Sequence, residues 1–162
     1  MKLLHHLLLP HAALDRRFPK ATLDAIERAV AESETRHTAE IRVAIEVALD
    51  LGALRRFSTP RDRALEVFGE LRVWDTAQRN GVLVYVLLAE RDVEIVADRG
   101  LEGRVGDAEW RGVCERIERE FGEGRWRDGA LAGIAGVTEL LAREFPAAGP
   151  NRNEQPDRPA IL

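Results

Sequence analysis

Five polar residues stand at the ends of apolar segments, and their chemistry suits the binding of a cation and a phosphate group. They are Glu40 before one segment, Arg79 and Asn80 before a second, and Asp98 and Arg99 after a third. Carboxylate and amide oxygens are hard ligands for Ca²⁺ or Mg²⁺, which makes Glu40, Asn80 and Asp98 candidate metal ligands. A bound cation activates water while arginines hold phosphate oxygens, so Arg79, Asp98 and Arg99 are candidate catalytic residues for phosphate ester hydrolysis.

The same residues also have an ordinary structural explanation. Asn80-Gly81 is a common turn or helix-stop signal, and Asp98-Arg99-Gly100 is typical of a turn that ends a strand. Glu40 would then lie on the solvated face of an edge strand. In this alternative the polar groups form a salt-bridge network that binds no ligand.

Three segments with the pattern of β-strands would carry these residues. Residues 39–47 alternate between apolar and polar side chains, which predicts a strand with one buried and one partly wet face. Residues 82–88 are apolar throughout, as in a central strand, and 93–98 form the second arm of a hairpin. A helix between the first two strands makes them parallel, so their starts share an edge with the end of the third. We therefore expect the candidate residues, together with His37 and Thr38, on one rim of the sheet.

Helical periodicity predicts helices over residues 22–34, 59–76, 107–121 and 126–144, with a loop over 49–58. Thr59-Pro60-Arg61-Asp62 is a helix start, and the helix that follows should direct Leu65, Phe68, Leu71 and Trp74 inward. The predicted fold is an α/β three-layer α/β/α sandwich. Its small mixed sheet combines a parallel β-α-β unit with an antiparallel hairpin strand.

Length and composition narrow the function classes. A chain of 162 residues with 45% hydrophobic residues is about one globular domain. The net charge of −4 argues against a sequence-independent nucleic-acid binder. A single cysteine, Cys114, excludes an internal disulfide framework, and no apolar run approaches the ~20 residues of a membrane span.

Three regions are expected along the chain: an apolar N-terminal segment (1–18), the domain (19–146) and a Pro-rich tail (147–162) that is a surface strap or a disordered end. The N-terminal segment lacks a clean cleavage site, which disfavours secretion and favours the cytoplasm. Residues 1–14 could still associate with a membrane. His5, His6 and His11 do not have the spacing of a metal motif.

Taken in order, several blocks resemble the TPM domain family, named for a thylakoid lumen protein, a photosystem repair protein and a receptor modulator. The resembling blocks are HTAEIRVAIE (37–46), RALEVFGELRVWDTAQRNGVLVYV (63–86), VEIVADRGL (93–101) and the later Trp110, Phe121-Gly122 and Leu131–Ile134. The resemblance covers roughly residues 20–145. It implies an α/β/α sandwich, phosphatase-like activity as in the plant branch, and calcium or another divalent ion. The family's frequent early acidic motif is replaced here by Asp15 or Asp24, which would weaken or shift a metal site.

The leading hypothesis is a TPM-domain protein with a divalent-metal rim and weak phosphatase activity on a phosphate ester. Within the family's blocks, the resemblance supports Glu40, Asn80 and Asp98 as the metal-binding set. The alternative is a non-enzymatic module that binds a protein partner, such as a membrane protein complex, with a structural metal or none.

Overall fold

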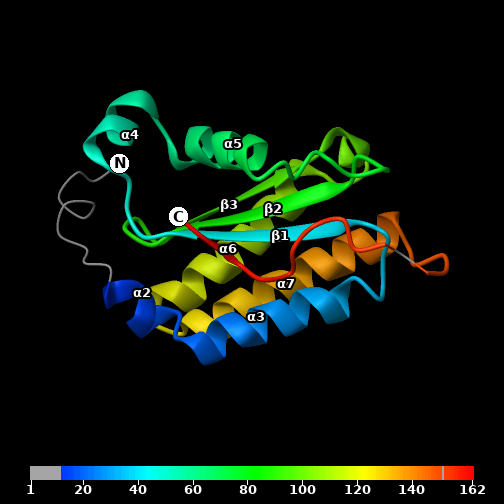
Figure 1. Ribbon diagram of the computed structural model, residues 1–162, viewed down its shortest axis with the longest axis horizontal. Helices are drawn as coiled ribbons and strands as arrows, with labels where there is room; N and C mark the ends of the chain where they lie inside the picture. Colours follow the sequence, from blue (N-terminus) through cyan, green and yellow to red (C-terminus); the bar gives the residue numbers. More distant parts are fainter. Residues whose placement is uncertain (1–11, 151) are drawn as a thin grey trace.

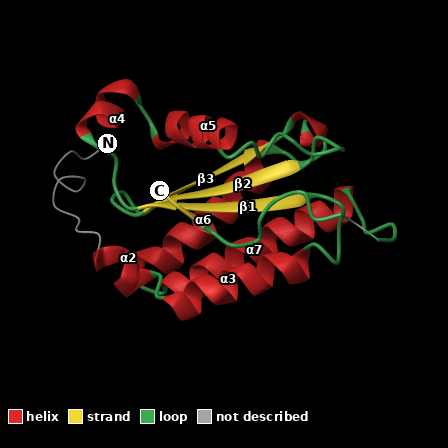
Figure 2. Cartoon of the chain, viewed as in Figure 1, coloured by secondary structure: helices red, strands yellow, loops and turns green. Residues whose placement is uncertain are grey.

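A four-stranded mixed sheet lies between two helical layers in the computed structural model, which describes residues 12–150 and 152–162 (Figure 1). The strands are β1 (Glu40–Glu46), β2 (Gly81–Leu87), β3 (Asp92–Ala97) and β4 (Ala160–Ile161). The helices are α2 (Ala12–Arg17), α3 (Lys20–Ser33), α4 (Leu51–Arg56), α5 (Pro60–Glu70), α6 (Asp107–Gly122) and α7 (Trp126–Glu144), with a 3-10 turn η1 (Arg99–Leu101). Helices α3, α6 and α7 cover one face of the sheet and α5 covers the other (Figure 2). The predicted α/β sandwich is confirmed.

The sheet order is β3-β2-β1-β4. Strands β1 and β2 are parallel, with Glu40 opposite Gly81, and β2 and β3 form the antiparallel hairpin. The fourth strand comes from the C-terminal tail, where Ala160 and Ile161 pair in parallel with Ala44 and Ile45. A two-residue strand has no readable periodicity, which explains why the sequence pattern did not indicate it.

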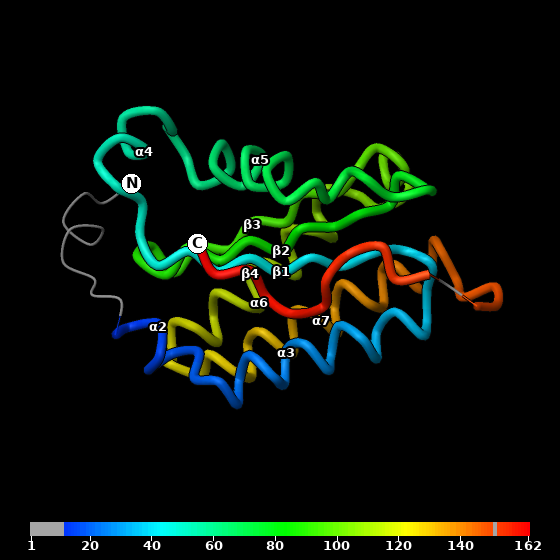
Figure 3. Tube along the Cα trace, viewed as in Figure 1, coloured from blue at the N-terminus to red at the C-terminus, as the bar shows by residue number. Residues whose placement is uncertain are grey.

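The C-terminal tail therefore acts as a strap along the outer side of β1 (Figure 3). The Arg42 guanidinium donates hydrogen bonds to the main-chain oxygens of Pro156 and Arg158. The Arg158 side chain pairs in turn with Asp24 and Glu27 on α3. Main-chain, guanidinium and carboxylate contacts together fix this segment to both β1 and α3.

Strand β1 is buried along its whole length, which corrects the prediction of one partly wet face. Its polar positions are covered because the strap lies over Arg42 and α5 lies over Glu46. The Glu46 carboxylate accepts from the Tyr85 hydroxyl at 2.6 Å and from Arg63 Nε at 3.0 Å. The polar half of the alternating pattern thus marks side chains that are paired inside the protein.

Helix α5 begins as predicted, with a capping box between Thr59 and Asp62, but it ends at Glu70. Its buried residues are Ala64 and Val67. Leu65 and Trp74, which were predicted to point inward, are 50% and 45% exposed. The helix stops early because Arg72 adopts a left-handed backbone with φ 54°, so Trp74 lies beyond the helix and loses the expected spacing.

Two further local differences concern a loop within the domain and the segment that precedes it. The expected loop over 49–58 contains α4, whose N-terminus is capped by the Asp50 carboxylate accepting from Ala53 N at 2.7 Å. Of the expected N-terminal segment (1–18), residues 12–17 form α2, while 1–11, including His5, His6 and His11, lie outside the described residues. Within residues 12–150 and 152–162, no helix has both the length and the hydrophobicity to cross a bilayer.

Candidate functional site

The rim residues Glu40 and Asp98 lie in one row across the sheet, with Gly81 between them. Glu40 is opposite Gly81, and Asp98 N donates to Gly81 O at 2.9 Å. Strand alternation directs both carboxylates to the face covered by α5, about two strand spacings or ~9.6 Å apart at Cα. A Cβ on Gly81 would collide with the main-chain oxygen of Val73. The row therefore contains two carboxylates with a main-chain oxygen directly over its centre.

Glu40 is completely buried beneath the strap. Its Oε2 accepts from the main-chain N of Gln155 at 3.1 Å, while its Oε1 has no hydrogen-bond partner among the described residues. Burial raises the pKa of Glu40 to about 7. The Gln155 side chain extends the cover by donating to the main-chain oxygen of Arg72 at 3.1 Å. Access to Glu40 thus depends on a tail residue that the sequence pattern did not connect with it.

Glu34 joins Glu40 as a second raised carboxyl group, which sequence reasoning missed. It follows the end of α3, and its Oε1 accepts from Ile41 N at 3.3 Å. Burial, with the negative charge of Glu40, raises the pKa of Glu34 to about 8. In the sequence, only the position of Glu34 between a predicted helix end and the predicted start of β1 could have indicated that its carboxyl group would be buried.

Asp98 is 8% exposed and belongs to the turn that follows β3. Its Oδ1 accepts from Arg99 N at 2.8 Å, and its Oδ2 is buried with no partner among the described residues. The Arg99 side chain is 67% exposed, with Nε 3.9 Å from Asp98 Oδ1. Gly100 N donates to Arg79 O at 2.8 Å, which joins this turn to the turn before β2. The structure therefore brings the predicted catalytic residues Arg79, Asp98 and Arg99 to one corner, with both arginines exposed to solvent.

Asn80 lies at the same edge of the sheet but on a different face. It immediately precedes Gly81, so strand alternation assigns its side chain to the face of Val82. Its Nδ2 donates to Thr38 O at 3.0 Å, and its main-chain N donates to Thr76 Oγ1 at 3.1 Å. Its Oδ1 is buried without a partner among the described residues. The predicted trio therefore shares an edge without sharing a face.

His37 does not belong to the rim. It is completely buried, with Nε2 2.8 Å from Ser33 Oγ and Nδ1 3.0 Å from Ala39 O. Ser33 Oγ is also 2.6 Å from Thr138 Oγ1 of α7. Burial lowers the pKa of His37 to about 4. This imidazole is a neutral core group bonded to the Ser33 hydroxyl, which in turn joins α3 to α7. The prediction of an imidazole on the rim was therefore wrong.

Across residues 12–150 and 152–162, no group of three or more His, Cys, Asp and Glu side chains could hold a metal ion. A cation between Glu40 and Asp98 would therefore rely on two carboxylates and main-chain oxygens. Four buried side-chain oxygens or nitrogens in the described residues have no hydrogen-bond partner, and three of them belong to the predicted ligands: Glu40 Oε1, Asn80 Oδ1 and Asp98 Oδ2. Such oxygens are the donor type that Ca²⁺ and Mg²⁺ require.

Comparison with known proteins assigns the family. Residues 15–140 match the TPM domain, which is more than half of the chain. The chain belongs to the TPM domain family. This TPM domain is similar to the NMR structure of BA42 from the psychrophilic bacterium Bizionia argentinensis, with 28% identity and a TM-score of 0.77 over 88% of this chain and 93% of that one.

A second solution NMR structure, the N-terminal domain of a protein from P. gingivalis, shares the fold. It is 20% identical with a TM-score of 0.60, over 80% of this chain and 81% of that one. No curated protein matches the sequence.

Proposed function

We propose that this TPM domain binds a divalent cation, Ca²⁺ or Mg²⁺, at the rim and acts weakly on phosphate esters there. One observation carries the proposal: the three oxygen-bearing side chains chosen from the sequence each keep one buried oxygen without a partner among the described residues. A buried polar atom without a partner is costly, and a bound cation would remove that cost. Glu40 and Asp98 would supply the charged ligands, with the main-chain oxygen of Val73 between them. The amide of Asn80 lies at the same edge but on the opposite face, so it would not bind this cation directly.

The surroundings of Asp98 determine how a phosphate ester could approach. Asp98 and Arg99 line a hollow of about 350 Å³ that also includes Glu102, Gly103 and Trp110. The exposed guanidinium groups of Arg79 and Arg99 would attract and orient the phosphate oxygens. A cation held in this position would neutralise phosphate charge and lower the pKa of a bound water. Glu40, closed off by the strap, would hold the cation from the inner side.

The cation part of the proposal is tested by melting the protein in EDTA and then with increasing Ca²⁺ or Mg²⁺. A ligand that binds only the folded state stabilises it by about 2.7 kcal/mol at a hundredfold excess over Kd. We expect a rise in Tm that Asp98→Asn removes. Asp92→Asn is the matched control, because Asp92 has the fourth partnerless buried atom but lies at the other end of β3. An equal rise in the Asp98→Asn variant, or no rise at millimolar metal, contradicts the proposal.

The phosphatase part is tested separately with p-nitrophenyl phosphate and the metal that raises Tm. We expect slow turnover that falls in Arg99→Gln, while the Tm shift with metal persists in that variant. Turnover unaffected by Arg99→Gln and Arg79→Gln would exclude the assigned roles of the arginines. A Tm shift without any turnover would reduce the proposal to cation binding alone.

A further inference from the structure

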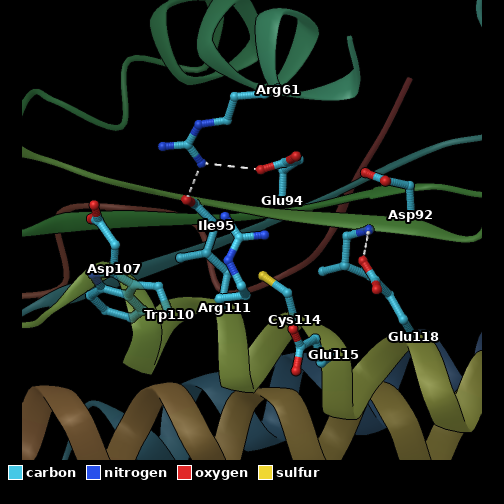
Figure 4. A pocket seen from close by; sticks show the side chains of 11 residues that line it. Arg61, Asp92, Glu94, Ile95, Asp107, Trp110, Arg111, Cys114, Glu115 and Glu118 are labelled. Carbon is cyan, nitrogen blue, oxygen red and sulfur yellow. Dashed lines mark hydrogen bonds and ion pairs between the residues drawn. The ribbon is translucent and has the colours of Figure 1, made fainter. Parts of the chain in front are cut away.

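The outer edge of β3 is bordered by a hollow of about 590 Å³ that separates α5 from α6 (Figure 4). Strand β3 is at the end of the sheet order, so one side of it has no neighbouring strand among the described residues. Asp98 N bonds to Gly81 O in the antiparallel ladder, and this register turns the main-chain groups of Val93, Ile95 and Ala97 outward. An outward row of this kind is the template for pairing with another chain.

Side chains, instead of a strand, occupy part of this outward row (Figure 4). Val93 N donates to Glu118 Oε1 at 3.2 Å, and Cys114 of α6 lines the hollow together with Ile95. The Arg61 guanidinium donates to Ile95 O and also to Glu94 Oε2, the latter at 3.3 Å. Arg61 and Glu118 are flexible side chains on the flanking helices, and an incoming strand could replace their contacts with main-chain hydrogen bonds.

Arg61 also shows which chemistry this edge accepts, since a cationic side chain already pairs there with a main-chain carbonyl and a carboxylate. The lining of the hollow is predominantly acidic. Its charged members are five carboxylates and two guanidinium groups: Asp92, Glu94, Asp107, Glu115 and Glu118, with Arg61 and Arg111. Burial and the neighbouring charges of Glu94 and Glu118 raise the pKa of Asp92 to about 7, and its Oδ1 has no partner among the described residues.

The two faces of β3 differ. Asp92 and Glu94 share the α5 face with Val96, whereas Val93 and Ile95 share the face that packs on α6. A strand added at this edge would place alternate side chains beside the acidic pair and the others beside the apolar pair. A second hollow of about 350 Å³ shares Arg61 and Ile95 with the first and continues to Asp98. The two hollows together therefore form a groove that runs beside β3 from Asp92 to Ala97, about 20 Å of extended chain.

We propose that the β3 edge binds an extended segment of a partner protein as a fifth strand, with Lys or Arg at alternate positions. Main-chain hydrogen bonds to Val93, Ile95 and Ala97 would provide the attachment, and the carboxylates of Asp92 and Glu94 would select basic side chains. This surface is separate from Glu40 and Asn80, and its use does not depend on a cation.

The test uses the full chain in EDTA and a labelled seven-residue peptide in which Lys and Val alternate, with binding followed by fluorescence polarisation. We expect saturable binding that weakens as salt increases. The double variant Asp92→Asn, Glu94→Gln should bind about tenfold more weakly, because it removes both charge pairs with the basic side chains of the peptide. Arg61→Ala should bind more tightly, because it removes the side chain that competes for Ile95 O.

Two controls separate strand addition from simple charge attraction. Glu32→Gln removes an exposed carboxylate on α3, away from the groove, and should leave affinity unchanged. A peptide of the same sequence, N-methylated at alternate residues, keeps its charge but loses main-chain donors and should not bind. Equal binding of the methylated peptide, weaker binding to Arg61→Ala, or no saturable binding of the parent peptide overturns the proposal.

Discussion

Replacing Glu40 by Gln should make folding stability less sensitive to pH. In the native protein the carboxyl is fully buried, and burial raises its pKa from 4.5 to about 7. A carboxyl whose pKa is raised by folding favours the folded state below its unfolded pKa, and this contribution is lost as pH rises through the folded pKa. The penalty for ionising Glu40 inside the protein therefore develops between about pH 4.5 and pH 7.

The size of this pH-dependent change in stability follows from the rise in the pKa of Glu40 on folding. At about 1.4 kcal/mol per pH unit, a rise of the Glu40 pKa from 4.5 to about 7 costs roughly 3–4 kcal/mol, of which roughly 2–3 kcal/mol falls between about pH 5 and pH 8. Glutamine keeps an oxygen of similar position to accept from Gln155 N, and it has no charge to bury. Glu40→Gln should gain about that amount over the native protein across this range. The change also lowers the pKa of Glu34, since the charge of Glu40 helps to raise it.

Urea denaturation in EDTA at several pH values measures the effect, using the difference in unfolding free energy between the two proteins at each pH. A difference that stays constant from about pH 5 to about pH 8 would refute the assignment of a buried, raised carboxyl. Repeating the series with Ca²⁺ links the result to the proposed site. A cation held by ionised Glu40 would stabilise the native protein at high pH and leave the variant unchanged.

Three further outcomes follow from the structure. Tyr85→Phe removes a buried 2.6 Å hydrogen bond to the Glu46 carboxylate and should cost about 1.5–3 kcal/mol in urea denaturation, with the wild-type m-value retained; a loss below about 0.5 kcal/mol would contradict this. Gly81→Ala places a methyl group against the main-chain oxygen of Val73 and should lower stability by at least about 3 kcal/mol, seen as a lower Tm by circular dichroism; an unchanged Tm would mean that the row across the sheet is looser than described. Cys114 is half-buried with its pKa raised to about 12, so it should react with a disulfide reagent much more slowly in the native protein than in urea, and equal rates would disprove its protection.

The elements with strong periodicity or explicit capping residues could be predicted from the sequence. The apolar alternation before Glu46, the Thr59 cap and the hairpin after residue 88 all have local causes, and the structure contains β1, α5 and β3 at these positions. The prediction of inward-facing residues was wrong at Leu65, which lies on the exposed side of α5, where Ala64 and Val67 are the buried residues. It was also wrong at Trp74, which lies beyond the left-handed turn at Arg72 that ends the helix. Backbone reversals of this kind depend on tertiary packing more than on residue type.

The candidate site was predictable only where strand topology determines it. Parallel β1 and β2 with antiparallel β3 place Glu40 and Asp98 in one row, as the order of elements indicates. The cover over Glu40 was not predictable, because Gln155 is more than a hundred residues away and its contact is through the main chain. Asn80 was assigned to the correct edge, but its face depends on a one-residue offset from Gly81 that turn residues do not specify.

The position of β4 also has a consequence for protein synthesis. Domains generally fold as the chain leaves the ribosome, with N-terminal parts first, at about 5–20 residues per second. The outer edge of β1 cannot be closed until residues 160–161 have emerged, although its other neighbour, β2, is available much earlier. A nascent chain therefore exposes one apolar strand edge to other chains for several seconds, a period in which chaperones would be needed most. Premature termination shortly before residue 155 would leave that edge open permanently, and such fragments should aggregate or be degraded.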